Sequence, residues 1–337
     1  MKFDWTLEGG IGTASGAATA VEADGYDGLW VGETNHDPFL SLVRAADATE
    51  RVSIGTAIAI AFARTPMTLA YLAYDLQEAS TGRFVLGLGS QVKPHIERRF
   101  SMPWSHPAAR MRELVLAMRA IWSSWEDGTK LDFRGDFYTH SLMTPFFAPP
   151  KHTFGPPPVF LAGVGELMTE VAGEVADGFF FHAFTTPHYL KTVTVPALEK
   201  GRAKTGKALT DFQICGPAFA ATGRTDEEIA RGIEIAKDRI AFYASTPSYR
   251  GVLEAHGWGD LQGELGALVK QGRWAEMGGL ISDEVFDAFA VAGSPEEVGR
   301  ALHDRFGDVA SRLTFYPMGE QDPQLWREVL AASRSAG

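Results

Sequence analysis

Short apolar runs alternate with longer amphipathic stretches along most of the chain. The first run is at residues 2–8, and a stretch with helical spacing separates it from the next run at 28–33. Each run is almost continuously apolar, which is typical of parallel strands that are covered on both faces of a sheet. The pattern predicts strands at residues 2–8, 28–33, 52–62, 83–90, 158–163, 178–184, 211–222 and 312–317.

The stretches between these runs carry signals for the start and the end of helices. Residues 13–25 form the first of them, with Thr13 as a candidate N-cap and Gly25 just past the end. Pro66 stands near the first position of a later helix, where proline is favoured. Eight strand–helix units predict an α/β fold, a (β/α)8 TIM barrel. A doubly wound parallel sheet is the alternative.

Two gaps between the predicted strands are too long for simple connections. Residues 91–157 contain an amphipathic helix, a predicted hairpin at 131–141 and a proline-rich stretch. Residues 223–311 contain several helical stretches. No change of composition marks a domain boundary, so we expect one domain over residues 1–337. In a barrel, such insertions usually cap the C-terminal face or contact another subunit.

Composition and charge narrow the class of protein. The 337 residues include 31 Lys and Arg against 42 Asp and Glu, a formal net charge of −11. This excess of negative charge argues against nucleic acid or an anionic membrane as the main partner, and favours a small-molecule substrate. A single cysteine, Cys215, excludes an intramolecular disulfide. Neither a signal-peptide pattern nor an apolar run of membrane length is present, which favours the cytoplasm.

Candidate catalytic groups lie after the predicted strands, because barrel active sites are at the C-terminal ends of their strands. The run at 28–33 ends in a polar cluster at residues 33–37, which includes Glu33, Asn35, His36 and Asp37. We interpret the cluster as the rim of an active site, with a solvated loop as the alternative. His36 is a candidate general acid or base, since an ordinary histidine pKa of about 6.5 permits proton exchange at cellular pH. A structural histidine or a helix cap is the alternative. No histidine pair has the spacing of metal ligands, so we expect no metal.

Other polar and aromatic residues have simpler interpretations. Cys215 lies within an apolar strand and is expected to pack as a small hydrophobic side chain. The aromatic residues Trp104, Trp122, Trp125, Phe179, Phe180 and Phe181 are expected to pack in the core or on helices.

A glycine-rich turn follows the predicted strand at 158–163. Gly163 and Gly165 stand where this strand turns directly into a helix. Backbone N–H groups at the start of a helix bind phosphate well, so the turn is a candidate phosphate site. The phosphate-loop lysine motif and the dinucleotide fingerprint are both missing. The alternative is that the glycines serve only steric needs.

Four segments, in this order, resemble the bacterial luciferase-like superfamily of barrel flavoenzymes. The similarity is greatest to the branch that uses the deazaflavin coenzyme F420. The segments are "GLWVGETNHDPF", "VSIGTAIAIAFARTPMTLAY", "STGRFVLGLGSQVKPHIERRF" and "PVFLAGVGELMTEVAGEVADGF".

The resemblance implies roles for residues of these segments. Asn35 and His36 match the pair that contacts the deazaflavin ring, with His36 acting on the substrate as a base or an acid. A cis peptide is implied between Ala57 and Ile58, against the back of the ring. Ser90 stands where some deazaflavin dehydrogenases carry a glutamate acid, which argues against sugar-phosphate dehydrogenation. The cofactor-binding residues implied are Asn35, His36, Ala57, Ile58, Gly87, Gly89, Ser90, Gln91, Gly163, Val164, Gly165, Glu166 and Met168.

The resemblance also implies a function. We expect hydride transfer between coenzyme F420 and a small organic substrate, with His36 as proton donor or acceptor, in a homodimer. The alternatives are an FMN-dependent luciferase-like monooxygenase and a non-catalytic protein that binds F420 or flavin. The candidate substrate contacts are Arg64, Lys93, His182, Tyr249 and Arg250.

Overall fold

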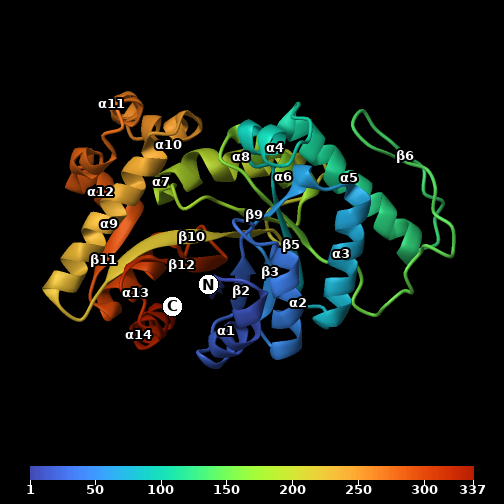
Figure 1. Cartoon of the computed structure of the whole chain (residues 1–337), viewed down its shortest axis with the longest axis horizontal. Helices are drawn as coiled ribbons and strands as arrows, with labels where there is room; N and C mark the ends of the chain where they lie inside the picture. The colour runs from blue at the N-terminus through green and yellow to red at the C-terminus, as the bar shows by residue number, and fades with distance from the viewer.

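The computed structural model describes residues 1–337 and contains a closed barrel of eight parallel strands with helices outside it (Figure 1). The barrel strands follow the order β1, β2, β3, β5, β8, β9, β10, β12. The sheet closes because β12 pairs with β1 and β10 pairs with both β9 and β12. This closure confirms the predicted TIM barrel and excludes the open, doubly wound sheet.

Each predicted strand has a counterpart in the barrel, with one interruption. The predicted strand at 52–62 is divided into β3 and β4, so a single continuous strand there was wrong. Between the two pieces, the Ala57 N–H donates to the Val31 carbonyl and the Ile58 carbonyl accepts from the Glu33 N–H. The strands are β1 Lys2–Thr6, β2 Gly28–Val31, β3 Ser53–Thr56, β4 Ala59–Ile60, β5 Phe84–Gly89, β8 Val159–Ala162, β9 Gly178–Phe180, β10 Gln213–Thr222 and β12 Arg312–Gly319.

The outer helices begin and end close to the sequence signals. Thr65 caps α3 by accepting from the Thr68 N–H, with Pro66 as the first helical residue, as predicted. Gly25 lies past α1 with φ +90°, also as predicted. Thr13 is not the N-cap of α1, because the helix begins earlier and Gly10 holds that position. These helices are α1 Ile11–Ala23, α2 Pro38–Ala48, α3 Pro66–Ala79, α5 Pro107–Glu126, α6 Glu166–Val175, α8 Val195–Ala203, α13 Pro295–Phe306 and α14 Pro323–Ser335.

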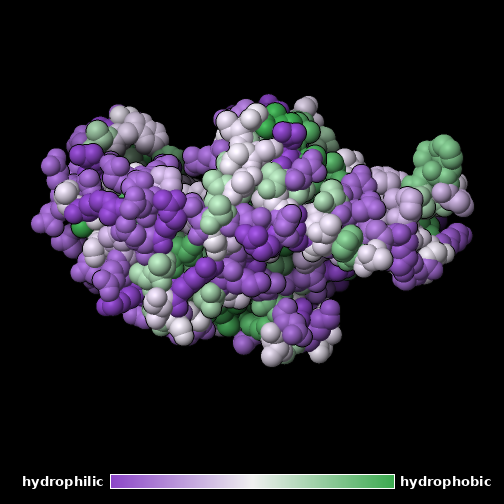
Figure 2. Space-filling view, turned by 90° about the horizontal axis from the view of Figure 1, so that it is seen from below, coloured by the Kyte–Doolittle hydropathy of each residue, from purple (hydrophilic) through white to green (hydrophobic).

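The first long insertion, residues 91–157, projects from one side of the barrel (Figure 1). It contains α4 Lys93–Arg98, α5 and the predicted hairpin, which is formed by β6 Phe133–Arg134 and β7 Thr139–His140. Leu142 and Phe146 in this segment have exposed side chains. Figure 2 shows a largely hydrophilic face with an apolar tip at the outer end of this projection. None of the helices combines the length and the apolar character that a membrane crossing needs.

The second insertion, residues 223–311, adds a smaller layer at the other side of the barrel (Figure 1). Its strand β11, Ala290–Gly293, pairs in parallel with the outer half of β10 and was not predicted. A second hydrophobic core of 19 buried residues, with Phe219, Phe286 and Phe289 among them, lies between these helices and the sheet. The helices are α7 Pro187–Tyr189, which precedes the insertion, then α9 Asp226–Ala244, α10 Arg250–Glu254, α11 Gly259–Lys270 and α12 Asp283–Phe289.

A buried ion pair fills the lower part of the barrel. Asp4 is fully buried and accepts from the Arg312 Nε at 2.9 Å and from the Trp30 Nε1 at 3.0 Å. Burial raises the pKa of Asp4, and the neighbouring guanidinium opposes that rise. Cys215 is buried in the same layer, as the sequence predicted. This layer closes the barrel beneath the site that lies at the opposite strand ends.

Candidate active site

A cavity of about 700 Å³ lies at the C-terminal ends of the barrel strands. This volume is within the range that small molecules and cofactors occupy. Aromatic side chains form much of its wall, including Trp30 and Phe180 from the strands, Phe181 directly after β9, and Trp104 from the first insertion. Twelve predicted site residues line it: Ala57, Ile58, Gly89, Ser90, Gln91, Lys93, Gly163, Val164, Gly165, Met168, His182 and Tyr249.

The peptide between Ala57 and Ile58 is cis, as predicted. Both residues line the cavity, and the backbone hydrogen bonds to Val31 and Glu33 hold them beside the end of β2. The Glu33 carboxylate also accepts from the Ile60 N–H at 2.7 Å. We expected Glu33 to face the site with the rest of the polar cluster, but it does not line the cavity, because its carboxylate binds the Ile60 N–H and Arg64. Its role here is to anchor the chain that follows the cis peptide.

The glycines at the end of β5 permit close packing against this segment. A Cβ atom at Gly87 would overlap the Thr56 carbonyl oxygen, and one at Gly89 would lie 2.8 Å from the Ile58 side chain. Gly87 itself lies below the cavity, where its N–H and carbonyl both bond to the Thr56 hydroxyl. Only glycine therefore lets β5 approach β3 and leave room for Ile58 at the cavity wall.

The turn between β8 and α6 presents free backbone N–H groups. Gly165 is the N-cap of α6, and no side chain caps the helix. A Cβ atom at Gly163 would lie 2.8 Å from Met168, whereas one at Gly165 would meet nothing within 4 Å. The first N–H groups of a helix need partners, and here open space lies beside them. This arrangement fits a phosphate group. Glu166, in the first turn of α6, does not line the cavity.

Asn35 and His36 lie at the same end of the barrel but do not line the cavity. Both side chains are exposed. Asn35 accepts from the Thr34 hydroxyl at 3.0 Å, and the His36 ring lies beside Gly10. Their proposed contacts with a cofactor and a substrate stay predictions.

Two of the five predicted substrate contacts bind to carboxylates instead of lining the cavity. Arg64 lies 2.6 Å from Glu33 and 2.7 Å from Asp37, with a side chain only 13% exposed. Arg250 lies 2.7 Å from Glu254 on the outside of α10. Lys93 does line the cavity and is the only charged residue that does so.

His182 follows β9 and is largely buried in the cavity wall. Its Nδ1 accepts from the Phe184 N–H at 3.0 Å. Its ring stacks on that of Tyr249, with centroids 4.8 Å apart. Burial lowers the pKa of His182 to about 4, so the ring is neutral at cellular pH. Tyr249 comes from the second insertion, which therefore contributes to the cavity wall.

Several lining residues were assigned to the core by sequence analysis. Phe180, Phe181 and Trp104 belong to the cavity wall as well as to the packing around it. Thr6 and Thr314 also line it, from β1 and β12. The alternation of inward and outward positions along a barrel strand is the signal for such residues, but it needs the strand register. The structure contains no group of three or more His, Cys, Asp and Glu side chains placed to hold a metal ion.

Comparisons with known proteins agree with this architecture. The family model for luciferase-like monooxygenases matches residues 4–312. An uncharacterized protein of Mycobacterium tuberculosis is 51% identical over 313 residues, covering 93% of this chain and 92% of that protein. The 5,10-methylenetetrahydromethanopterin reductase of Methanolobus tindarius is 27% identical, covering 85% of this chain and 84% of the reductase.

A solved structure gives the same fold at lower identity. The coenzyme F420-dependent tetrahydromethanopterin reductase from Methanopyrus kandleri superposes with a TM-score of 0.79 at 19% identity, covering 98% of this chain and 96% of that one. The family model spans most of the chain, and the closed barrel carries the expected strand ends. The protein therefore belongs to the luciferase-like monooxygenase family, the bacterial luciferase-like group of barrel oxidoreductases and monooxygenases.

Proposed function

We propose that the protein is a coenzyme F420-dependent oxidoreductase, which transfers a hydride between the deazaflavin and a small organic substrate. One observation carries the proposal: the backbone segment at Ala57–Ile58 and the open turn at Gly163–Gly165 line the same cavity of about 700 Å³. The first would support the ring and the second would hold the phosphate. The coenzyme F420-dependent reductase from Methanopyrus kandleri supports the same cofactor.

The cavity residues fit such a cofactor. When bound, the deazaflavin supplies a ring carbon that accepts or donates hydride and that reacts poorly with oxygen. The protein's contribution is to orient the reactants and exclude water, for which the aromatic wall of Trp30, Trp104 and Phe180 is suited. His36, at the end of β2, would take up or release the accompanying proton, with Asn35 beside it at the ring.

An FMN-dependent monooxygenase is the second candidate, because the family includes monooxygenases. The only cationic side chain in the cavity wall is Lys93, which follows β5 rather than the glycine turn. The backbone N–H groups of that turn could receive the phosphate of either cofactor. The titration described next distinguishes the two candidates.

Cofactor titration tests the proposal directly. Purified protein is titrated separately with oxidised F420 and with FMN, and binding is followed in their distinct absorbance bands. We expect tighter binding of F420, and then bleaching of its band by a substrate from a panel of alcohols and other hydride donors. Binding of FMN alone, followed by oxygen consumption, would overturn the proposal in favour of the monooxygenase. Tight F420 binding without any turnover would support a non-catalytic binding protein.

The proton role of His36 has a separate test. We expect His36→Ala to lower the turnover number while the dissociation constant of F420 changes little. Unchanged turnover removes His36 from the mechanism.

We also propose that the chain acts as a single domain and as a homodimer in the cytoplasm. Both insertions contribute residues to one cavity, which supports a single unit. Sedimentation equilibrium of the purified protein measures the subunit number.

A further inference from the structure

The imidazole of His182 is held as one defined tautomer. Its Nδ1 accepts from the Phe184 N–H at 3.0 Å. A neutral imidazole has one acceptor nitrogen and one N–H donor, so the proton must be on Nε2. Nε2 makes no hydrogen bond within the protein and is not enclosed by it, while His182 lines the cavity. The ring therefore presents an N–H donor to a ligand.

Two tyrosines fix the orientation of this ring. Tyr249 stacks on it with an interplanar angle of 23°, and Tyr243 packs against it edge-on with centroids 4.7 Å apart. Tyr249 lines the cavity and Tyr243 does not. Rings packed on both sides leave His182 little freedom to turn its Nε2 elsewhere.

Tyr249 adds a second neutral donor beside the first. Its hydroxyl has no partner in the protein, and burial raises its pKa to about 12. The hydroxyl therefore keeps its proton over the cellular pH range and can donate it in a hydrogen bond. The cavity thus has two adjacent donors that carry no charge.

The surroundings of these donors select against anions. Arg250, the neighbour of Tyr249 in the chain, binds Glu254 and does not line the cavity. Lys93 is the only cation in the wall, and its side chain is 61% exposed. A carboxylate or phosphate desolvated against two neutral donors would lack a counter-charge, which is costly. An uncharged oxygen loses less hydration free energy when it leaves water, and the two hydrogen bonds are enough to replace its contacts with water.

We propose that His182 and Tyr249 recognise an uncharged carbonyl oxygen of the substrate, so that the substrate class is ketones, aldehydes or enones. The inference rests on the proposed function, because it assigns the substrate side of the same cavity. The aromatic wall formed by Trp104, Phe181 and their neighbours accommodates the hydrocarbon part of such a molecule. Neither residue is assigned proton transfer; both position the substrate.

Binding of small probes by calorimetry tests the inference without turnover. The probes are cyclohexanone, cyclohex-2-enone and acetophenone, with cyclohexanecarboxylate as the anionic counterpart. Each is titrated into the protein alone and into the protein with F420. We expect the ketones to bind more tightly than the carboxylate. Failure of F420 to bind would contradict the proposed function, while the titrations of the protein alone would still test the two donors.

Four variants separate hydrogen bonding from packing. Tyr249→Phe removes one hydroxyl and keeps the stacked ring, and His182→Ala removes the N–H. Each substitution should weaken ketone binding about fivefold to tenfold, which corresponds to the loss of one hydrogen bond. His182→Gln places an amide N–H near the lost donor and should restore most of the affinity. Tyr243→Phe keeps the ring that packs on His182, does not alter the cavity, and should bind ketones as the wild type does.

Three results would overturn the inference. The first is tighter binding of cyclohexanecarboxylate than of any ketone, or no binding by all three ketones. The second is an equal loss in Tyr243→Phe, which would assign the effect to packing. The third is weaker F420 binding in Tyr249→Phe with ketone binding unchanged, which would assign the two donors to the cofactor.

Discussion

The Arg64 guanidinium lies 2.6 Å from the Glu33 carboxylate, directly behind the segment that follows the cis peptide. The same carboxylate accepts the Ile60 N–H, so one side chain joins the end of β2 to β4. Asp37 binds the other side of Arg64 at 2.7 Å. Part of the polar cluster at residues 33–37 therefore supports the cavity wall from outside instead of facing a ligand.

Glu33→Gln should destabilise the fold and weaken cofactor binding together. The substitution leaves the Arg64 guanidinium, 13% exposed, with only Asp37 as counter-charge. Breaking a largely buried ion pair costs about 3 kcal/mol. Because Ile60 loses its charged acceptor, the wall at Ala57 and Ile58 should also loosen. Urea unfolding and F420 titration of the same preparations measure the two effects.

A matched control is the ion pair between Arg273 and Glu276, which is about half exposed on both sides. Glu276→Gln should leave the free energy of unfolding almost unchanged, because solvent screens an exposed pair. Equal losses in the two variants would contradict the role given to Glu33.

Gly165→Val should weaken cofactor binding without destabilising the protein. The backbone at Gly165 is extended, with φ −87° and ψ 152°, which suits a β-branched residue. A Cβ atom there meets no protein atom within 4 Å, so a new side chain would collide only with a bound ligand. We expect F420 affinity to fall more than tenfold, roughly the loss of one or two charge-assisted hydrogen bonds. The melting temperature should stay nearly unchanged.

Gly263→Ala is the control for Gly165→Val. Gly263 also has open space around its Cβ position, but it lies within α11, away from the cavity. Alanine in a helix stabilises by up to about 1 kcal/mol relative to glycine, and F420 binding should be unaffected. Unchanged F420 affinity in Gly165→Val would remove the glycine turn from the phosphate site.

The barrel was predictable because the sequence signals for its strands and helices lie within each segment itself. Continuous apolar runs marked every barrel strand, and Pro66 with Thr65 marked the start of α3. β11 escaped prediction because four residues after a helix give no periodic signal, and only pairing with β10 makes them a strand. The division of the third strand depends on hydrogen bonds to Val31 and Glu33, which are contacts between distant segments.

The parts of the candidate site that the backbone forms were predictable. The glycine turn follows from local sequence, whereas the cis peptide was implied only by the resemblance to the luciferase-like superfamily. Both line the cavity. The binding partners of the charged side chains were not predictable, because a lysine or arginine side chain can reach many carboxylates. Arg64 and Arg250 bind carboxylates that the sequence did not single out as partners. Likewise, the tautomer of His182 depends on one backbone N–H, which only the structure places.

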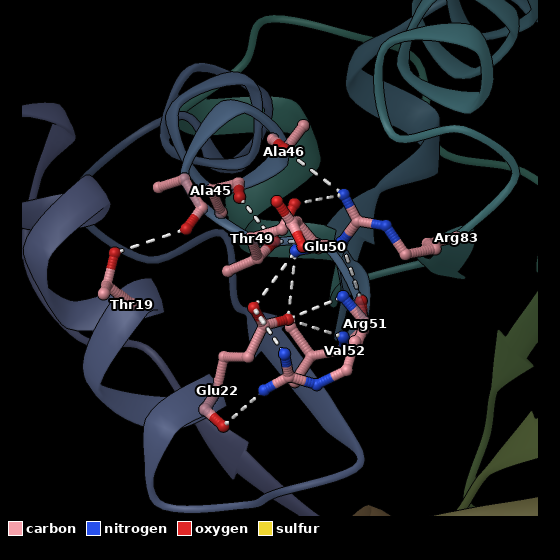
Figure 3. A network of polar contacts seen from close by, with 10 residues as sticks. Thr19, Glu22, Ala45, Ala46, Thr49, Glu50, Arg51, Val52 and Arg83 are labelled. Atoms are coloured by element: carbon pink, nitrogen blue, oxygen red, sulfur yellow. Dashed lines mark hydrogen bonds and ion pairs between the residues drawn. The ribbon is translucent and has the colours of Figure 1, made fainter.

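Glu22→Gln should destabilise the end of the barrel that lies away from the cavity. The Glu22 carboxylate accepts the N–H groups of Glu50, Arg51 and Val52, as Figure 3 shows. Burial alone would raise the pKa of Glu22, but these backbone hydrogen bonds outweigh it and lower the pKa. The stabilisation is therefore present above the ordinary pKa of 4.5 and is lost as the pH falls through the lower, folded value.

The measurement is the free energy of unfolding from pH 7 to pH 3 for the wild type and Glu22→Gln. At pH 7 the variant should be less stable by about 1–2 kcal/mol, and the difference should shrink in acid. Turnover should not change, because the network with Arg83 and Thr49 lies at the other end of the strands. A difference that is constant with pH would show that the carboxylate charge is not what stabilises this loop.

His182 should make the folded protein sensitive to mild acid. Burial lowers its pKa from 6.5 to about 4, and the groups packed on its ring are the aromatic side chains of Tyr243 and Tyr249. The unfolded chain therefore takes up a proton at a higher pH than the folded protein does. This contribution to stability is complete above pH 6.5 and is lost as the pH falls towards 4, by roughly 3 kcal/mol.

The control variant is His182→Gln, whose side chain cannot titrate. The wild type should therefore lose stability relative to this variant between pH 6.5 and pH 4. Other histidines titrate in both proteins and cancel in the difference. Long-range proton–nitrogen NMR spectra of the wild type at pH 7 should show the proton on Nε2. Parallel stability curves for the two proteins, or a ring that is protonated on both nitrogens at pH 6, would contradict a neutral His182 in the cavity wall.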